Sequence, residues 1–218
     1  MNTLRQTFLR VRNLRGVHGQ ISIDEPLGRW ISAVVSDPDV RVVLEIGSWE
    51  GKGSTRVLGE VGSELKDPPT VISLEANRDR AARAARRNSK FRHLKVICGT
   101  LVQVADLDVE DLSDVERDWL LDDLRVLTDS PYILDMIPSS IDALILDGGE
   151  FSTRAEFELL QRRLTKYLVL DDTRTRKCRK IAEEIRNGSS QFSVIVDSAD
   201  RNGFMIAKKM TSQTAVAR

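Results

Sequence analysis

Acidic side chains stand at the ends of three apolar runs that the sequence predicts to be buried strands. These acids are Glu75, Asp147, Asp171 and Asp172. Ligands of open α/β sheets bind outside the carboxyl ends of the strands, so the acids are predicted to border one crevice. An acid at the position of Glu75 can accept hydrogen bonds from both hydroxyls of a ribose, and the alternative is a solvated strand-end acid.

Two interpretations of the trio Asp147, Asp171 and Asp172 remain open. Three carboxylates that converge without a cation repel one another, and Mg²⁺ with oxygen ligands would relieve the repulsion. Adjacent acids of a regular strand point to opposite faces, so both members of the pair face the crevice only if the chain turns there. In the alternative, one or two of the acids cap helices or pair with nearby basic side chains, namely Arg174, Arg176 and Lys177.

A glycine-rich turn joins a predicted strand at 40–46 to a helix that begins near residue 54. Glycine lets a backbone approach a ligand closely or adopt a positive φ. Strand, glycine-rich turn and helix together prepare a crevice for a nucleotide-like ligand. The dinucleotide fingerprint G-x-G-x-x-G would require glycine at Trp49 and Lys52, so the turn does not match that pattern.

Predicted strands and helices alternate along the chain. The strands are expected at 40–46, 70–75, 93–98, 141–147, 167–172, 192–196 and 203–207. A turn signal at 200–203 indicates that the last two strands are antiparallel. Asp24 is the expected N-cap of the helix that precedes the first strand, and Thr153 with Glu156 has capping-box spacing. The pattern predicts an α/β, Rossmann-like sheet, mostly parallel with one antiparallel strand and with helices on both faces.

One main domain is predicted, because 218 residues suffice for a single substantial core. Residues 1–38 are expected to form a helical extension with a flap, residues 39–209 the ligand-binding domain, and residues 210–218 a tail. Within the domain, 106–139 is an acidic helical insertion expected near the substrate side.

Composition excludes several classes of partner. Thirty-three basic and thirty-three acidic residues give a formal net charge of zero, so no global field favours nucleic acid or an anionic membrane. No apolar run approaches the roughly 20 residues that span a bilayer, and no signal peptide is recognisable. Two cysteines give neither a disulfide framework nor a metal-ligand pair. A cytoplasmic protein is the expectation.

Two motifs carry a resemblance to a known family. Glu45-x-Gly47-x-x-x-Gly51-x-Gly53 resembles the first motif of class I S-adenosylmethionine-dependent methyltransferases. Asp147-Gly-Gly-Glu-Phe-Ser-Thr153, followed by Leu168-Val-Leu-Asp171-Asp172, resembles metal-assisted O-methyltransferases of the macrolide-sugar and cephalosporin-tailoring type. The resemblance covers about residues 20–209. It departs from that pattern at Gly149, where many of those enzymes carry a further acid, and at Glu150, where catechol-type relatives place a lysine base.

The resemblance implies a seven-stranded methyltransferase sheet, S-adenosylmethionine as cofactor and Mg²⁺ at Asp147, Asp171 and Asp172. The cofactor-binding residues that it implies are Glu45, Gly47, Ser48, Gly51, Gly53, Ser54, Glu75, Gly99, Thr100 and Asp147.

The activity that the resemblance implies is O-methylation of a hydroxyl on a small molecule or sugar. Asp147 and His18 are the candidate catalytic residues. His18 lies on a glycine-flanked segment and could act as a general base near pH 7, although a surface histidine is the alternative. Lys177 and Glu150 are further candidates for the base, which the sequence does not identify.

Two other functions remain as alternatives: a non-catalytic binding protein with the methyltransferase fold, and a nicotinamide-dependent oxidoreductase, which the glycine pattern disfavours. The expected partner is a hydroxylated small molecule, without nucleic acid or membrane, and self-association into a homo-oligomer is left open.

Overall fold

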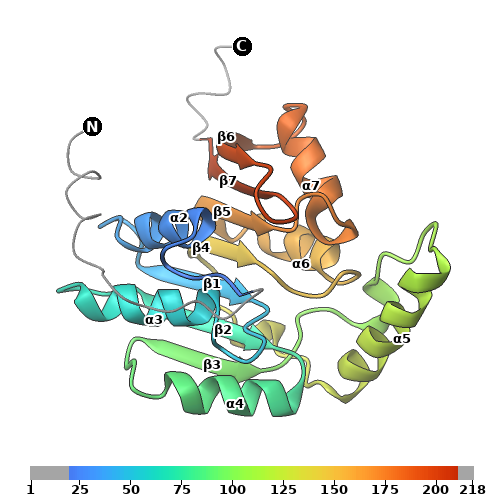
Figure 1. Cartoon of the computed structure of the whole chain (residues 1–218), viewed down its shortest axis with the longest axis horizontal. Coiled ribbons are helices and arrows are strands. Elements are labelled where there is room, and N and C mark those ends of the chain that lie inside the picture. Colours follow the sequence, from blue (N-terminus) through green and yellow to red (C-terminus); the bar gives the residue numbers. More distant parts are fainter. Residues whose placement is uncertain (1–19, 211–218) are drawn as a thin grey trace.

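The computed structural model describes residues 20–210, and seven strands form one sheet at their centre (Figure 1). The strand order across the sheet is β3-β2-β1-β4-β5-β7-β6. The strands are β1 (Val42–Ile46), β2 (Thr70–Glu75), β3 (Leu94–Cys98), β4 (Ile141–Leu146), β5 (Leu164–Asp171), β6 (Phe192–Ser198) and β7 (Phe204–Lys209).

Strands β1 to β5 are parallel, and β7 pairs antiparallel with both β5 and β6. Six strands therefore share one direction and β7 alone is reversed, which confirms the predicted sheet. Strand β1 pairs on both sides, with Leu44 opposite Ile72 of β2 and Leu144 of β4. The carboxyl ends of the parallel strands consequently meet along a single edge.

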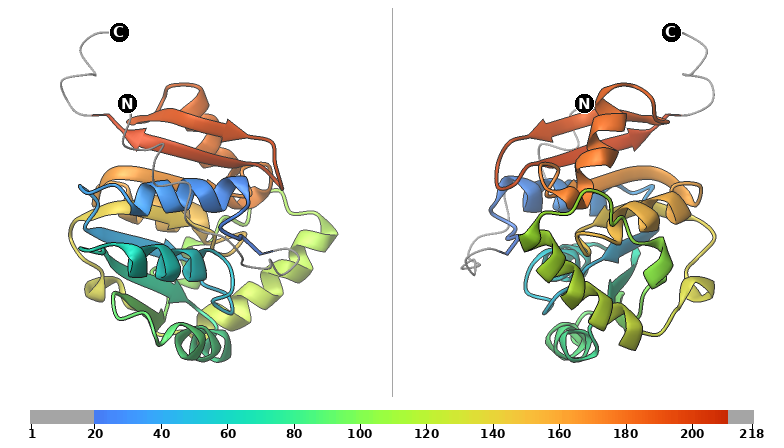
Figure 2. Two further views of the ribbon diagram at one scale, coloured as in Figure 1. Left: turned by 60° about the vertical axis from the view of Figure 1, so that its left-hand side comes forward. Right: turned by 90° about the vertical axis from the view of Figure 1, so that its right-hand side faces the viewer.

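Helices cover both faces of the sheet. On one face lie α2 (Pro26–Val35) and α3 (Ser54–Glu64), and on the other lie α6 (Thr153–Leu160) and α7 (Arg176–Arg186), as the two views of Figure 2 show. Helix α4 (Arg78–Asn88) packs along β3 at the sheet's edge. Because neighbouring strand residues point to opposite faces, Val43 joins the core under α2 and α3, whereas Leu44 joins the core under α6 and α7.

Two predicted helix starts differ from the structure. Glu25, not Asp24, occupies the N-cap position of α2, and its side chain makes no capping hydrogen bond; Pro26 at the first helical position supplies the preset φ instead. Helix α6 has Ser152 at its N-cap without a side-chain cap, so the predicted capping box at Thr153 is absent. The side chain of Thr153 instead donates back to the carbonyl oxygen of Gly149.

The acidic insertion contains the long helix α5 (Asp114–Asp129) between two short 3₁₀ turns, η2 (Val104–Asp106) and η3 (Leu134–Met136). A capping box between Ser113 and Glu116 begins α5, and none of its residues is buried. The helix projects from the body of the molecule (Figure 1). An ion pair of 3.0 Å between Glu116 and Arg176 of α7 connects the first turn of α5 to the body of the protein.

Residues 1–19 and 211–218 lie outside the described part of the chain, so the predicted N-terminal helix, His18 and most of the tail do too. Of the predicted flap, which spans 16–23, residues 20–23 are described, and both Ile21 and Ile23 are buried in the core under α2 and α3. Within residues 20–210, none of the helices combines the length and the apolar character needed to cross a membrane.

Candidate functional site

A cavity of about 880 Å³ opens at the carboxyl ends of β1, β2, β4 and β5. Residues of the glycine-rich turn, the ends of these strands and helix α5 line it. Its volume falls within the range of roughly 300–1,000 Å³ that is usual for ligand pockets. Most of the predicted site residues meet here: Gly47, Ser48, Gly53, Ser54, Glu75, Gly99, Thr100, Asp147, Asp171 and Asp172 all line the cavity.

The turn after β1 brings three strands together at the cavity wall. Gly47 has a φ of +95°, and a Cβ atom added there would lie 2.0 Å from the backbone oxygen of Asp147. The N–H groups of Gly47 and Ser48 both donate to the carbonyl oxygen of Leu74, each at 2.9 Å. Glycine is therefore required at this position by its φ and by the close approach of the chain after β4.

The start of α3 presents the positive end of a helix to the cavity. Gly53 is its N-cap without a side-chain capping bond, and both Gly53 and Ser54 line the cavity. An anionic group of a ligand is stabilised at such an end. Gly51 has a φ of +70° and packs against Ala84 and Asn88 of α4. It does not line the cavity, so it shapes the turn rather than the wall.

Glu45 lies behind the wall and also does not line the cavity. Its carboxylate is fully buried and accepts hydrogen bonds from the hydroxyl groups of Thr55 and Ser73, which links β1 to α3 and β2. Burial raises its pKa to about 7, although hydrogen bonds with Ser54, Ser73 and Thr55 oppose the shift. Direct cofactor contact by Glu45 stays a prediction; the structure gives this acid a supporting position.

Glu75 is held by backbone donors on both oxygens at the end of β2. The N–H of Trp49 donates to one oxygen at 2.8 Å, and the N–H of Asn77 donates to the other at 2.9 Å. Burial raises its pKa, although these donors and the charge of Arg80 oppose the shift. Each oxygen has a further lone pair for a ligand hydroxyl. Arg80 stacks 3.5 Å above the ring of Trp49, and both line the cavity beside this acid.

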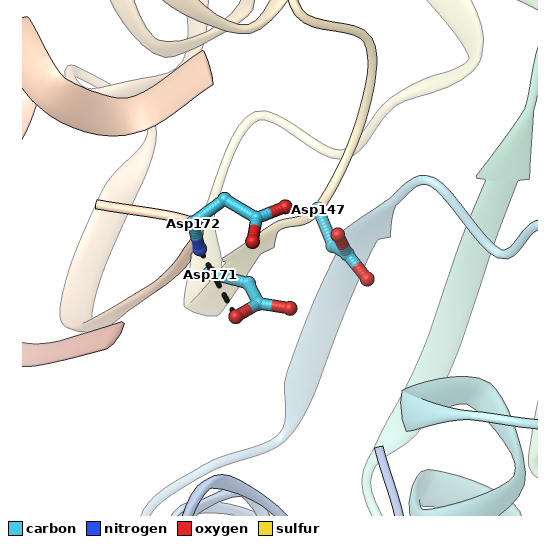
Figure 3. Close-up of side chains that lie close together, drawn as sticks. All are labelled: Asp147, Asp171 and Asp172. Carbon is cyan, nitrogen blue, oxygen red and sulfur yellow. Dashed lines mark hydrogen bonds between the residues drawn. The ribbon is translucent and has the colours of Figure 1, made fainter. Parts of the chain in front are cut away.

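The opposite wall carries the three aspartates, whose side chains extend toward one another from the ends of β4 and β5 (Figure 3). One carboxylate oxygen of each lies within 4.8 Å of the others. The chain does turn here: Asp172 has a φ of +56°, and its N–H donates to the carboxylate of Asp171 at 3.0 Å. This departure from strand geometry is what allows adjacent acids to face one site.

Lys177 connects two of these acids. From the first turn of α7, its ammonium lies 2.9 Å from Oδ1 of Asp147 and 2.6 Å from Oδ2 of Asp172. Arg201 lies 3.5 Å from Asp171, and Asn202 donates to Asp172 at 3.0 Å. The pairing with Lys177 that the alternative interpretation of the trio expects is therefore present, and the role of the trio stays a prediction.

The acids of the trio differ in their electrostatics. Burial and the charges of Asp147 and Asp172 raise the pKa of Asp171 to about 7. Burial also raises the pKa of Asp147, against the charge of Lys177. For Asp172, burial is outweighed by the charge and hydrogen bond of Lys177, and the pKa is lowered. The two aspartates raise the pKa of Lys177 against the effect of burial, so its ammonium stays charged.

A divalent cation does not fit this arrangement alongside Lys177. Five of the six carboxylate oxygens have a protein donor, although each of them keeps a second lone pair. The obstacle to an ion is the ammonium of Lys177, which lies within hydrogen-bond distance of both Asp147 and Asp172. Oxygen ligands must have a lone pair directed at the ion, and Mg²⁺ demands near-octahedral geometry. The Mg²⁺ site implied by the sequence resemblance therefore stays a prediction that these contacts do not support, and no chemical step below uses it.

Two further acids that the sequence did not single out as functional line the cavity, Glu156, which is buried, and Asp123, which is half-buried. Glu156 of α6 is 4% exposed, and its Oε2 makes no hydrogen bond within the described chain. Burial raises its pKa to about 8; a hydrogen bond with Ser152 opposes the shift and the charge of Asp123 adds to it. Burial likewise raises the pKa of Asp123, on α5, to about 6. Glu156 shares a helix face with Phe157 and Leu160, and that apolar spacing was the available signal of its burial.

Glu150, one candidate for the base, caps α7 from outside. Its Oε2 accepts the N–H of Lys177 at 2.9 Å and its carboxylate also accepts the hydroxyl of Thr175. An acid at a helix N-terminus is stabilised by the helix dipole. The structure therefore gives Glu150 the role of orienting the turn that carries Lys177.

The sheet order, the reversed β7 and the cavity at the strand ends define the fold of class I S-adenosylmethionine-dependent methyltransferases, and solved structures bear this out. A Bacillus cereus O-methyltransferase in complex with SAH matches with a TM-score of 0.53 and 18% identity, over 85% of this chain and 81% of that chain. A Geobacter sulfurreducens methyltransferase matches with a TM-score of 0.56 and 15% identity, over 88% and 82%.

A third match is the precorrin-6y C5,15-methyltransferase of Geobacter metallireducens, with a TM-score of 0.54 and 14% identity, over 90% of this chain and 94% of that chain. No protein-family model matches the sequence. No curated protein matches it either. At these identities the likeness establishes the fold, and the predicted methyltransferase sheet is confirmed.

Proposed function

We propose that the chain is an S-adenosylmethionine-dependent methyltransferase that methylates a hydroxyl group of a small molecule. The observation that carries the proposal is that one cavity joins the glycine turn and Glu75 on one side to the aspartates and Lys177 on the other. The first group suits an adenosine, and the second suits a reacting hydroxyl. The cavity is large enough for a cofactor beside a small acceptor.

In this proposal the cofactor lies across the ends of β1, β2 and β3. Its ribose hydroxyls donate to the free lone pairs of Glu75, its adenine lies beside Gly99 and Thr100, and its carboxylate faces the start of α3 at Gly53 and Ser54. With all three carboxyl groups ionised, the aspartates together with Lys177 and Arg201 carry a net charge of −1, from −3 and +2. A negative region there would stabilise the positive sulfonium of the cofactor.

Methyl transfer requires alignment and charge placement more than covalent help from the protein. The bond between the methyl carbon and sulfur breaks with its electron pair left on sulfur, and the carbon–oxygen bond forms in line. The hydroxyl proton passes to a carboxylate, for which we propose Asp147. Lys177, charged and hydrogen-bonded to the same carboxylate, fixes its orientation.

The acceptor in this proposal is small and not a nucleic acid. Among the charged residues that line the cavity, the acids outnumber the bases by eight to four. A phosphate backbone would meet net repulsion there, whereas nucleic-acid sites gather lysine and arginine. Trp119 of α5 lines the cavity with half of its surface exposed, and so offers a flat apolar wall for a sugar or ring.

Calorimetry and a transfer assay test the function. We expect S-adenosylmethionine and SAH to bind with one-to-one stoichiometry, NAD to show no binding, and labelled methyl groups to move to members of a panel of hydroxylated small molecules. NAD binding without S-adenosylmethionine binding would overturn the proposal. Cofactor binding without transfer to any acceptor would support the alternative of a non-catalytic binding protein.

The substitution Glu75→Ala tests the cofactor geometry. We expect the dissociation constant for S-adenosylmethionine to rise about 10- to 100-fold, because hydrogen bonds to a charged group contribute about 1.5–3 kcal/mol. Isothermal titration measures the change. Glu50→Ala is the matched control: Glu50 lies in the same turn but pairs with Arg83 and Arg87 outside the cavity. Equal affinities of the two variants would contradict the ribose role of Glu75.

A further inference from the structure

Lys177 occupies an unusual position for a lysine. It is the second residue of α7, where the helix dipole disfavours a positive charge, and only 9% of it is exposed. A buried ammonium is costly unless it is paired and hydrogen-bonded. The contacts at 2.9 Å to Asp147 and 2.6 Å to Asp172 provide that compensation. The buried ammonium is therefore stabilised by the two carboxylates, and the ammonium in turn stabilises the charged form of Asp172.

The ammonium lies where a cation shared by the carboxylates would be expected, since it contacts acids from two different strands, β4 and β5. Arg201 supplies a second positive charge at Asp171. With all three aspartates ionised, adding a divalent ion would change the local net charge from −1 to +1, next to the place proposed for the sulfonium. Like charges at close range in a cavity of low dielectric constant repel strongly. Geometry and charge both disfavour a metal ion while Lys177 is present.

We propose that the ammonium of Lys177 replaces a divalent cation among Asp147, Asp171 and Asp172, excludes Mg²⁺, and orients the acceptor oxygen. An ammonium has three N–H donors, and the two carboxylates account for two of them. Because Lys177 also lines the cavity, the third can reach an acceptor oxygen. Only this last contact rests on the proposed function; the exclusion of metal does not.

Mn²⁺ binding, followed by electron paramagnetic resonance on the whole chain without cofactor or acceptor, tests the proposal. We expect no saturable binding to the wild-type protein up to about 1 mM Mn²⁺, and at least about 10-fold tighter binding to Lys177→Met. In that variant the carboxylates of Asp147 and Asp172 lose the ammonium, and with Asp171 beside them they form a set of hard oxygen ligands. Mn²⁺ should also raise the Tm of Lys177→Met and leave that of the wild-type protein unchanged.

Two variants serve as controls. Lys180→Met removes a lysine of the same helix that pairs with Asp108 outside the trio, and should behave as the wild-type protein does. Lys177→Met/Asp172→Asn should lose the Mn²⁺ binding that Lys177→Met gains. If Lys177→Met does not fold, Lys177→Gln, which is neutral and polar, replaces it.

Saturable Mn²⁺ binding to the wild-type protein that Asp172→Asn abolishes would overturn the proposal. Folded Lys177→Met and Lys177→Gln proteins that bind no Mn²⁺ would overturn it as well. Because these measurements need no methyl transfer, their outcome is independent of the transfer assay. If transfer is observed, its rate should be unchanged by EDTA or added Mg²⁺, whereas Lys177→Met should lower kcat.

Discussion

Replacing Glu156 by Gln is expected to raise the free energy of unfolding at pH 8.5 by about 3–5 kcal/mol, with little change at pH 4.5. The folded-state pKa of Glu156 is about 8, compared with an ordinary value of 4.5. Because the folded-state value is the higher one, the unfolded chain loses its proton first as the pH rises. The stabilising contribution is complete below pH 4.5 and is lost as the pH rises through 8.

The physical cause is burial that one hydrogen bond, with Ser152, does not offset. Glu156 is 4% exposed and its Oε2 makes no hydrogen bond in the described chain, so ionisation leaves a poorly compensated charge close to Asp123. Glutamine has the same shape and never ionises. The free energy of unfolding of the wild-type protein should therefore fall by up to about 1.4 kcal/mol per pH unit between pH 4.5 and 8, because Glu156 ionises more easily in the unfolded chain. The Glu156→Gln protein should not show this fall.

Urea unfolding at a series of pH values measures the difference between the two proteins. Glu45, whose pKa is also raised, is present in both proteins, so its contribution to the pH dependence of unfolding cancels in the difference. Glu158→Gln is the matched control, because Glu158 lies on the exposed side of the same helix and pairs with Arg154. Its effect should be within about 0.5 kcal/mol, as for other exposed pairs. Wild-type and Glu156→Gln proteins of equal stability at pH 8.5 would show that Glu156 ionises at an ordinary pH.

Most of the fold could be predicted because local pattern and global architecture agree. Runs such as Val42–Ile46, rich in branched apolar residues, can be buried on both sides only in a sheet covered by helices, and the intervening helical spacings supply that cover. The first and last residues of the strands and helices could not be predicted as well. Strand β5 begins at Leu164, three residues before the predicted start, because its pairing with Ile141 of β4 extends it. Pairing between distant residues is invisible in a local pattern.

The site was predictable wherever it follows from strand direction. Parallel strands place their carboxyl ends at one edge, so Glu75, Asp147 and Asp171 had to lie near one another. Glu45 differs because it lies one residue before the strand's last residue. Together with Val43 it points to the side covered by α2 and α3, away from the cavity. A motif can thus contain an acid that supports the turn without lining the cavity.

The pairing of Lys177 was one of two open interpretations, and sequence alone could not decide between them. Lys177 can reach the trio only if α7 begins so close behind β5 that the first turn of the helix lies beside the three acids. The left-handed φ of Asp172 and the cap that Glu150 forms on Lys177 bring this about. Both are tertiary effects. Glu156 was misjudged for a related reason: its spacing from Thr153 fits a capping box, but a buried helix face uses the same spacing.

Replacing Gly47 by Ala should have the largest effect on the cofactor site. We expect the free energy of unfolding to fall by about 3–5 kcal/mol and the dissociation constant for S-adenosylmethionine to rise more than about 100-fold. The added Cβ would lie 2.0 Å from the backbone oxygen of Asp147 and 2.9 Å from Cα of Gly148. Since these are backbone atoms, no side-chain rotation relieves the overlap. The ends of β1 and β4 must separate, and Asp147 moves with them.

The positive φ alone would not produce such an effect, and Gly188→Ala separates the two causes. Gly188 has a φ of +70° at the end of α7, and a Cβ atom there would meet nothing within 4 Å. Its replacement should cost about 1 kcal/mol, the usual penalty for a left-handed backbone, and leave cofactor affinity unchanged. Urea unfolding and isothermal titration of both variants measure the difference. If Gly47→Ala proved no less stable than Gly188→Ala and bound cofactor equally well, then the close approach of the β1 turn to Asp147 would not be what shapes the site.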